Sequence, residues 1–352
     1  MIVLANDGIA ASGQAKLEAA GHTVLTTKVA QEQLADFINA EKVDVLLVRS
    51  ATTARAALID ACPGLKMIGR GGVGMDNIDV DYAKSKGINI FNTPAASSES
   101  VAELVFAHLS GLLRFLPDSN RMMPLEGEAK FDGLKKAYGK GLELRGKTLG
   151  IIGFGRIGRA VARQGYGLGM RIVAHDPFVT DGSFEVQFAD GQKLSTSATM
   201  LSMSELLATS DAVSIHIAGK SEVLGAAELA QMKKGAFLVN AARGGVVNEE
   251  ALLNALDHGH LAGAALDVFT NEPTPHVNLL MHEKLSLTPH IGAATEEAQD
   301  RISTELHRFG GMRRGTEASI DDHGDTGLLD DDAKEITGQQ ATIRADGRTE
   351  WH

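Results

Sequence analysis

Residues 147–178 read KTLGIIGFGRIGRAVARQGYGLGMRIVAHDPF, and this stretch decides the fold of the chain. Gly153, Gly155 and Gly158 form the pattern G-x-G-x-x-G between an apolar run and a run with helical periodicity. The first glycine of such a turn permits a tight bend, the second lets a pyrophosphate approach the backbone, and the third lets helix and strand pack closely. The free N–H groups at the helix start face the phosphates. The stretch therefore predicts a strand–turn–helix unit that binds a dinucleotide.

An acidic residue, Asp176, ends the next predicted strand. Its distance from the glycines is close to the spacing of about 20 residues at which such folds place an acid on the adenosine ribose. A carboxylate there can accept hydrogen bonds from both ribose hydroxyls and repels a 2′-phosphate. The sequence therefore predicts NAD rather than NADP, the alternative being a glycine-rich turn in a domain that binds no nucleotide.

On both sides of this unit, short apolar runs alternate with longer amphipathic ones. This β-α-β order predicts parallel sheets covered by helices. Residues 99–116 have apolar side chains at helical spacing and predict one long helix between two domains, followed by a polar, basic loop. The alternation FEVQF predicts an added hairpin between Phe178 and Met200.

Composition limits the class of protein. A length of 352 residues suits two domains of roughly 100–200 residues each, and a net charge of −11 argues against general binding to nucleic acid or membrane surfaces. Cys62 is the single cysteine, and the sequence has neither a signal-peptide pattern nor an apolar stretch of ~20 residues, so a cytoplasmic protein is expected. Residues 310–352 are acidic and poor in apolar side chains, and most of this atypical tail is predicted to be disordered.

Three further strand ends carry polar side chains: Arg243 in NAARGGVVNEE, Glu272 in DVFTNEP and His290 in LTPHIGAAT. The carboxyl ends of parallel strands line one crevice, so all three are expected to face the cofactor. Oxidation of an alcohol needs a base for the hydroxyl proton, and histidine titrates near neutrality. A carboxylate orients such a histidine, and arginine suits a substrate carboxylate. Each residue alone also fits a turn or a solvated surface, but together they predict dehydrogenase chemistry without a metal.

The segments GFGRIGR, HDP, NAARGGVVNE, ALDVFTNEP and LTPHIGAAT, in this order and spacing, resemble the D-isomer-specific 2-hydroxyacid dehydrogenase family. The resemblance extends from the N-terminus to about Leu306. It implies an α/β fold of two doubly wound parallel-sheet domains with the active site in the cleft between them. The flavodoxin-like substrate domain would comprise residues 1–93 and 291–309, and the Rossmann NAD domain residues 94–290.

The same resemblance implies site residues. Arg243, Glu272 and His290 would be the catalytic set, and Asp267 would lie near the nicotinamide carboxamide. The residues expected on the cofactor are Gly153, Gly155, Arg156, Ile157, Gly158, Asp176, His216, Ala218, Ala241, Asp267 and Gly292. The family usually has a proline near Ala218, so the sequence departs from the pattern there.

VRSATT, IGRGGVGMDNIDV and SVAEL are most similar to the short phosphoglycerate dehydrogenases of this family. That likeness implies that the backbone N–H groups of the Gly72-Val73-Gly74 loop bind the substrate carboxylate, since glycine allows a close approach. Arg49 and Arg70 are candidates for a phosphate at the far end of the substrate. The residues that could add charge from a neighbouring subunit, or lie on a solvated loop, are Lys135 and Lys136.

The favoured function is oxidation of 3-phosphoglycerate to 3-phosphohydroxypyruvate, the entry to serine synthesis, by a homodimer formed through the nucleotide domain. Reduction of hydroxypyruvate, glyoxylate or pyruvate (a D-lactate dehydrogenase) is the alternative within the family, because the catalytic set would be the same. An NAD-sensing transcriptional co-repressor of the same fold is an alternative of a different class. The acidic net charge does not favour contact with DNA.

Overall fold

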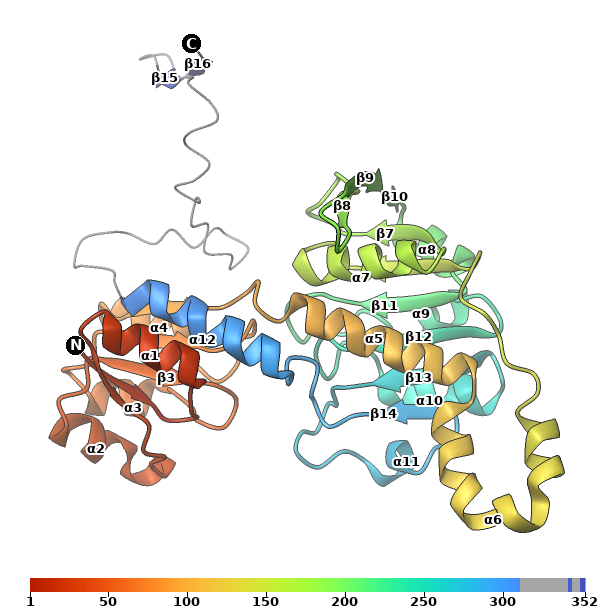
Figure 1. The fold of residues 1–352 in the computed structure, drawn as a ribbon, viewed down its shortest axis with the longest axis horizontal. Helices are drawn as coiled ribbons and strands as arrows, with labels where there is room; N and C mark the ends of the chain where they lie inside the picture. The colour runs from red at the N-terminus through yellow and green to blue at the C-terminus, as the bar shows by residue number, and fades with distance from the viewer. Residues whose placement is uncertain (311–340, 344–348, 352) are drawn as a thin grey trace.

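The computed structural model describes residues 1–310, 341–343 and 349–351. Two parallel sheets flanked by helices form two lobes that lie side by side (Figure 1). Two short antiparallel strands, β15 (Ala341–Ile343) and β16 (Thr349–Trp351), pair near the end of the chain. The predicted disorder of the tail otherwise concerns residues outside those described.

The first lobe contains a five-stranded parallel sheet in the order β2-β1-β3-β4-β5. This is the flavodoxin-like order, which reverses direction between β1 and β3. Strand β3 reads VLLV and is buried along its whole length, as expected where helices cover both faces of a sheet. The elements are β1 (Ile2–Ala5), α1 (Ala11–Ala19), β2 (Thr23–Leu25), η1 (Gln31–Gln33), α2 (Leu34–Ala40), β3 (Val45–Val48), α3 (Ala56–Ala61), β4 (Met67–Arg70), α4 (Val80–Ser85) and β5 (Asn89–Asn92).

The second lobe contains a seven-stranded parallel sheet in the order β10-β7-β6-β11-β12-β13-β14. Its first six strands follow the dinucleotide-binding order 3-2-1-4-5-6, so the predicted fold of two doubly wound parallel sheets is confirmed. The elements are β6 (Thr148–Ile152), α7 (Arg156–Gly167), β7 (Arg171–His175), β10 (Thr199–Met200), α8 (Met203–Thr209), β11 (Ala212–Ile215), α9 (Ala226–Gln231), β12 (Ala236–Asn240), α10 (Glu249–Asp257), β13 (Leu261–Leu266), α11 (Val277–Leu280) and β14 (Leu285–Leu287).

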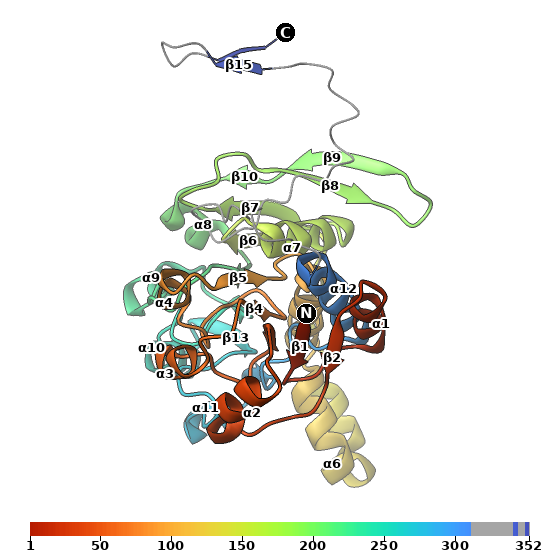
Figure 2. The same ribbon diagram turned by 90° about the vertical axis from the view of Figure 1, so that its left-hand side faces the viewer.

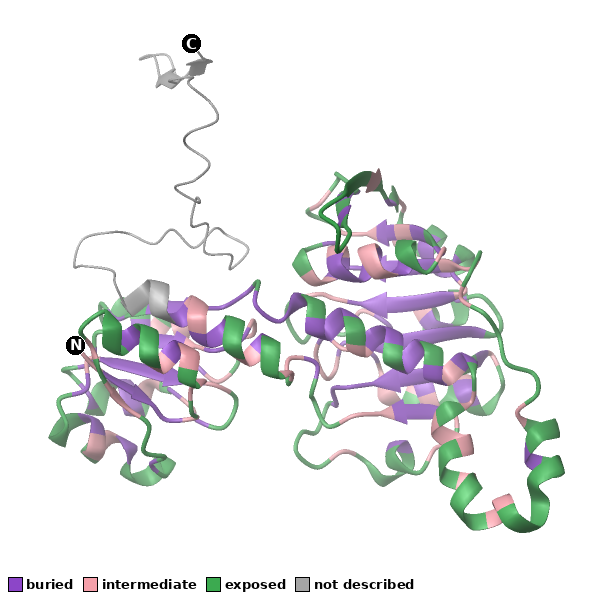
Figure 3. Ribbon diagram, in the orientation of Figure 1, coloured by how far each residue is buried: buried purple, intermediate pink, exposed green. Residues whose placement is uncertain are grey.

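The long helix predicted over 99–116 is confirmed as α5 (Ser98–Leu113), which ends three residues earlier than predicted. Helix α5 (Ser98–Leu113) ends before Phe115, whose φ of 55° is left-handed, and α6 (Leu116–Ala137) begins with a proline in its first turn. Helix α6, which is kinked at Lys130, occupies much of the predicted polar loop. It projects from the second lobe and is mostly exposed (Figure 3), so it lacks the buried apolar face that would have marked it in the sequence.

The described residues contain no single helix that is long and apolar enough to cross a bilayer. Only α5 and α6 taken together reach the required length and apolarity, and a bend of 57° separates them.

The predicted hairpin is present as β8 (Ser183–Gln187) and β9 (Lys193–Ser197), which pair antiparallel. Phe184 and Val186 point to the buried face while their neighbours are exposed, which is the alternation of a half-buried strand. Phe184 packs edge-on against Phe154 of the glycine-rich turn, with ring centroids 6.4 Å apart. Figure 2 shows the hairpin over α7 at the outer edge of the second lobe.

The chain crosses between the lobes twice, once before α5 and once before α12 (Glu296–Gly310), which returns to pack beside α1 (Figure 1). The two crossings are joined, because Ser100 Oγ donates to the carbonyl oxygen of Gly292 over 2.8 Å. Arg301 Nε also donates to the carbonyl oxygen of Ala96 over 2.8 Å. Ile302 of α12 is buried against the first sheet.

Candidate active site between the lobes

His290 and Glu272 form a hydrogen-bonded pair at the carboxyl ends of β14 and β13. His290 Nδ1 lies 2.8 Å from Glu272 Oε2, and the other carboxylate oxygen accepts from the N–H of Phe269 over 2.9 Å. The two side chains are 50% and 37% exposed, so both are accessible to a ligand. Because Nδ1 faces the carboxylate, Nε2 is the ring atom that can meet a substrate hydroxyl. The arrangement suits a histidine base oriented by a carboxylate.

Residues 288–292, here called the catalytic loop, are held by the buried carboxylate of Asp267. Oδ1 accepts from Thr288 Oγ1 over 2.6 Å and from the N–H of Ile291 over 2.8 Å. Oδ2 accepts from the N–H of Gly292 over 2.9 Å. The resemblance assigned Asp267 to the nicotinamide carboxamide, whereas in the structure both of its oxygens hold the loop that carries His290.

Arg243 follows β12 and reaches from the second lobe to the first. Its Nη1 donates to the carbonyl oxygen of Ala242 over 2.8 Å, and its Nε donates to Asp76 Oδ2 over 3.0 Å. A side chain at Gly74 would place its Cβ 1.7 Å from Arg243 Nη2, so this nitrogen lies directly on the glycine loop. Lys220 Nζ lies 3.8 Å from the other oxygen of Asp76. The sequence reasoning missed Asp76, although it stands two residues after the predicted loop.

The Gly72-Val73-Gly74 loop is tied to the residues after β5. The N–H of Gly72 donates to Thr93 Oγ1 over 2.8 Å, and Asn92 Nδ2 donates to the carbonyl oxygen of Val73 over 2.7 Å. The prediction that Gly72 offers its N–H to a substrate is therefore wrong for this conformation, because Thr93 takes it. The loop can offer the N–H groups of Val73 and Gly74.

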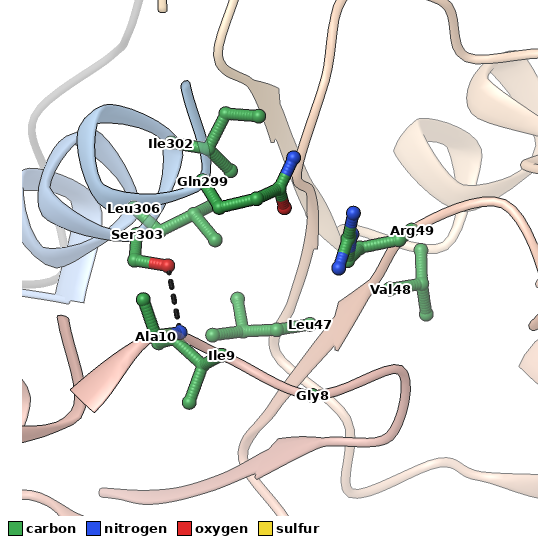
Figure 4. Close-up of a pocket in the computed structure, with 10 residues that line it drawn as sticks. All are labelled: Gly8, Ile9, Ala10, Leu47, Val48, Arg49, Gln299, Ile302, Ser303 and Leu306. Atoms are coloured by element: carbon green, nitrogen blue, oxygen red, sulfur yellow. Dashed lines mark hydrogen bonds between the residues drawn. The ribbon is translucent and has the colours of Figure 1, made fainter. Parts of the chain in front are cut away.

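The two arginines expected at the far end of the substrate occupy different places. Burial, and to a smaller extent the nearby positive charges of Arg243 and Arg49, lowers the pKa of Arg70 to about 10. Within the part of the chain that the structure describes, Arg70 Nε is buried without a hydrogen-bond partner. Arg49 instead lines a cavity of about 290 Å³ between the ends of β1 and β3 and helix α12, where it points toward Gln299 (Figure 4). Lys135 and Lys136 are exposed in the last turn of the projecting helix α6.

The glycine-rich turn has the geometry that a dinucleotide requires. Gly153 has a φ of 89°, and a Cβ there would lie 2.4 Å from the carbonyl oxygen of His216. A Cβ at Gly158 would lie 2.1 Å from the carbonyl oxygen of Gly153, whereas a Cβ at Gly155 would meet nothing within 4 Å. The first and third glycines therefore allow close packing, and the second faces open space where a pyrophosphate can approach.

Asp176 is held by three backbone N–H groups: that of Phe154 on Oδ2, and those of Phe178 and Val179 on Oδ1. A carboxylate has about four lone-pair positions, so roughly one is left for a ribose hydroxyl rather than the two expected. The hydrogen bond from Phe154 links the acid directly to the glycine-rich turn. The residues present thus fit an adenosine ribose next to a pyrophosphate.

The remaining predicted cofactor residues also lie at the carboxyl edge of the second sheet. His216 Nε2 lies 2.7 Å from Ser214 Oγ, and burial lowers the pKa of His216 to about 3, so the ring is neutral. Ala218 is exposed beyond the end of β11. The others follow β12, begin α7 or follow β14: Ala241, Arg156, Ile157 and Gly292.

Comparison with known proteins agrees with this site. Residues 106–292, more than half of the chain, match the NAD binding domain of D-isomer specific 2-hydroxyacid dehydrogenases. The chain is 41% identical over 271 residues to a hydroxypyruvate reductase of Thermotoga maritima, covering 75% of this chain and 83% of that protein. It is 39% identical to a D-3-phosphoglycerate dehydrogenase of Bacillus subtilis over 75% of this chain, but it spans only 48% of that protein's length.

Among solved structures, a glyoxylate reductase from Paecilomyes thermophila superposes with a TM-score of 0.69 at 31% identity, covering 87% of this chain and 93% of that one. The likeness thus includes both lobes rather than the nucleotide-binding lobe alone. A family match over more than half of the chain, together with a relative 41% identical over most of both lengths, shows that this chain belongs to the D-isomer specific 2-hydroxyacid dehydrogenases, a family of NAD-binding oxidoreductases.

Proposed function

We propose that the chain oxidises 3-phosphoglycerate to 3-phosphohydroxypyruvate with NAD. The observation that supports dehydrogenation is that the His290–Glu272 pair and Arg243, whose Nη2 lies on Gly74, follow the neighbouring strands β12, β13 and β14 at one edge of the second sheet. The observation that favours a phosphorylated substrate is Arg70, a partly buried cation whose Nε is unpartnered within the described residues. Reduction of hydroxypyruvate is the second candidate, favoured by the high coverage of the Thermotoga maritima relative.

In the proposed mechanism, the N–H groups of Val73 and Gly74 and the guanidinium of Arg243 bind the substrate carboxylate. His290 Nε2 takes the proton of the 2-hydroxyl, and Glu272 stabilises the resulting imidazolium through Nδ1. NAD held by the turn from Gly153 to Gly158 and by Asp176 would supply the acceptor for the hydride. In the reducing direction His290 returns the proton to the carbonyl oxygen, which Arg243 polarises.

We propose that the cofactor is held by the turn from Gly153 to Gly158 and by Asp176. Gly158→Ala is expected to raise the Kd for NAD at least tenfold and to lower the Tm by several degrees, because its Cβ would meet a backbone oxygen. Gly155→Ala is expected to weaken NAD binding while the Tm stays within about 1 °C of that of the parent, because its Cβ would meet nothing in the apoprotein.

Fluorescence titration and thermal unfolding measure these two effects. Gly64→Ala is the matched control, since a Cβ there also meets nothing within 4 Å and the site lies in the other lobe. Unchanged NAD affinity in Gly155→Ala would contradict the assignment of this turn to the pyrophosphate.

The choice between substrates depends on Arg70. Arg70→Met is expected to lower kcat/KM for phosphohydroxypyruvate about 100-fold and for hydroxypyruvate by less than about threefold, since charged hydrogen bonds to the phosphate are lost. NADH-linked rates with phosphohydroxypyruvate, hydroxypyruvate, glyoxylate and pyruvate measure this. The same rates measured for Arg49→Met test whether the cavity that Arg49 lines binds the phosphate instead. Arg55→Met is the control, because it removes an exposed arginine paired with Asp79. Equal losses on all four substrates would refute a phosphate-binding role.

We also propose which part of the chain binds which molecule: residues 1–93 with 291–309 bind the substrate, and residues 94–290 bind NAD.

A homodimer formed through the nucleotide-binding lobe is supported by α6, which projects with Leu125 73% and Phe131 57% exposed. In such a dimer, the lysines at the end of α6 would extend toward the partner.

We further propose a cytoplasmic location, in keeping with Cys62 as a buried free thiol.

A further inference from the structure

One buried histidine outside the proposed catalytic set contacts the catalytic loop. His108 lies on α5 and is only 5% exposed. Its Nδ1 lies 2.8 Å from Ser286 Oγ in β14, and its Nε2 lies 2.9 Å from Thr288 Oγ1 in the catalytic loop. Both ring nitrogens are therefore engaged by hydroxyl groups on the segment that leads to His290.

The donor and acceptor roles in this chain of hydrogen bonds follow from its last member, the carboxylate of Asp267, which can only accept. Thr288 has one hydroxyl proton, which it donates to the carboxylate of Asp267 over 2.6 Å. Thr288 Oγ1 must therefore accept from Nε2–H of His108, and His108 Nδ1 must accept from the hydroxyl of Ser286. Burial lowers the pKa of His108, in keeping with this neutral ring. This chain of hydrogen bonds, here called the relay, runs from Ser286 through His108 and Thr288 to Asp267. Each of these side chains has a hydrogen-bond partner in it.

The loop needs such support because its backbone is strained. His290 has a φ of 55°, a left-handed conformation that residues with a Cβ rarely adopt. The surrounding contacts must impose that conformation. Asp267 supplies them by accepting from the N–H groups of Ile291 and Gly292, and its carboxylate is in turn fixed by Thr288.

We propose that His108 is a positioning residue for the reaction: it orients Thr288 and Asp267 so that the catalytic loop holds His290 against Glu272. This inference rests on the proposed role of His290 as the proton acceptor. Helix α5 would then act on the loop at two points, through His108 and through the hydrogen bond from Ser100 to Gly292. His108 itself touches neither substrate nor cofactor in this scheme.

Three single variants and one double variant test the two hydrogen bonds of the ring. His108→Met keeps the apolar bulk and removes both, and His108→Gln retains an amide N–H that can still donate to Thr288. We expect His108→Met to lower kcat about tenfold with KM and the Kd for NAD within twofold, and His108→Gln to recover at least a third of the parent kcat. Thr288→Val should lower kcat at least as much, and the double variant His108→Met/Thr288→Val no further, because the relay passes through Thr288.

The rates are measured with NADH and whichever of phosphohydroxypyruvate, hydroxypyruvate, glyoxylate and pyruvate the parent reduces fastest. Hydrogen–deuterium exchange of a peptide spanning the catalytic loop gives a readout independent of turnover, and exchange in His108→Met should be at least fivefold faster. His260→Met is the control, since His260 Nε2 bonds only a backbone carbonyl, that of Leu229, in another part of the lobe.

A His108→Met enzyme with unchanged kcat and loop exchange would overturn the inference, as would a lowered Tm without any change in kcat. If His108→Met does not fold, the comparison of Thr288→Val with His108→Gln decides: additive losses in their double variant would also overturn it. His290→Ala separates this inference from the proposed function. Full activity in that variant would refute the catalytic role of His290, whereas loop exchange in His108→Met would still report whether His108 holds the loop.

Discussion

His290→Ala is expected to lower kcat by about 10²–10⁴-fold, the usual contribution of a positioned acid–base group. The Kd for NAD should change by less than about twofold, because the imidazole is hydrogen-bonded to Glu272 rather than to the glycine-rich turn. Stopped-flow measurement of NADH formation, combined with fluorescence titration of NAD, separates the two quantities.

Glu272→Gln is the companion variant, since glutamine retains an oxygen for the N–H of Phe269 but loses the charge that stabilises an imidazolium. Its kcat should fall less than that of His290→Ala. An equal loss of NAD affinity and of rate in His290→Ala would make the histidine a cofactor contact and refute its role in proton transfer.

Arg243→Lys is expected to lower kcat/KM by about 10²–10³-fold, even though the charge is kept. The guanidinium bonds Asp76 through Nε and Ala242 through Nη1 while Nη2 lies on Gly74, and a single ammonium cannot reproduce this planar fork. Loss of two charge-assisted hydrogen bonds, at about 1.5–3 kcal/mol each, accounts for the magnitude. Both KM and kcat should change, because in the proposed mechanism the guanidinium binds the substrate carboxylate and also polarises the reacting oxygen.

Lys220→Ala is the control for this experiment, since Lys220 is a second cation near the same Asp76, at 3.8 Å, whereas the atoms nearest to a Cβ at Gly74 belong to Arg243 and Asp76. Its kcat/KM should stay within about threefold of the parent value. Arg243→Lys with parent-like KM and kcat would show that a nonspecific positive charge is sufficient and would contradict bidentate recognition.

The fold was predictable because its signals are local. Gly153, Gly155 and Gly158 each occupy a position in the turn where a Cβ would interfere with close packing or with the approach of a ligand. The buried strands are short apolar runs in the sequence. The strand ends that carry Arg243, Glu272 and His290 could also be placed at one edge of the sheet, because the carboxyl ends of parallel strands lie together. The structure adds the distance of 2.8 Å between the last two.

What could not be predicted depends on contacts between distant segments. Nothing in the sequence around Asp76 distinguishes it from the other acidic residues. Its importance comes from the hydrogen bond to Arg243, which is 167 residues away in the chain. His108 reads as part of a helical apolar pattern, and its partners lie 178 and 180 residues further along. Phe115 ends a helix without glycine or a side-chain cap, so nothing in its immediate sequence except the following Pro117 marks the break.

The two crossings between the lobes have a mechanical consequence. Because Ser100, just after the first crossing, is hydrogen-bonded to Gly292 in the second, we expect any rotation of one lobe against the other to have its pivot near this joined point. His290 stands two residues from the pivot and would be displaced little by the swing, whereas the Arg243–Asp76 contact spans the lobes directly and must part when they separate. We therefore expect opening to break the Arg243–Asp76 contact while the His290–Glu272 pair stays together.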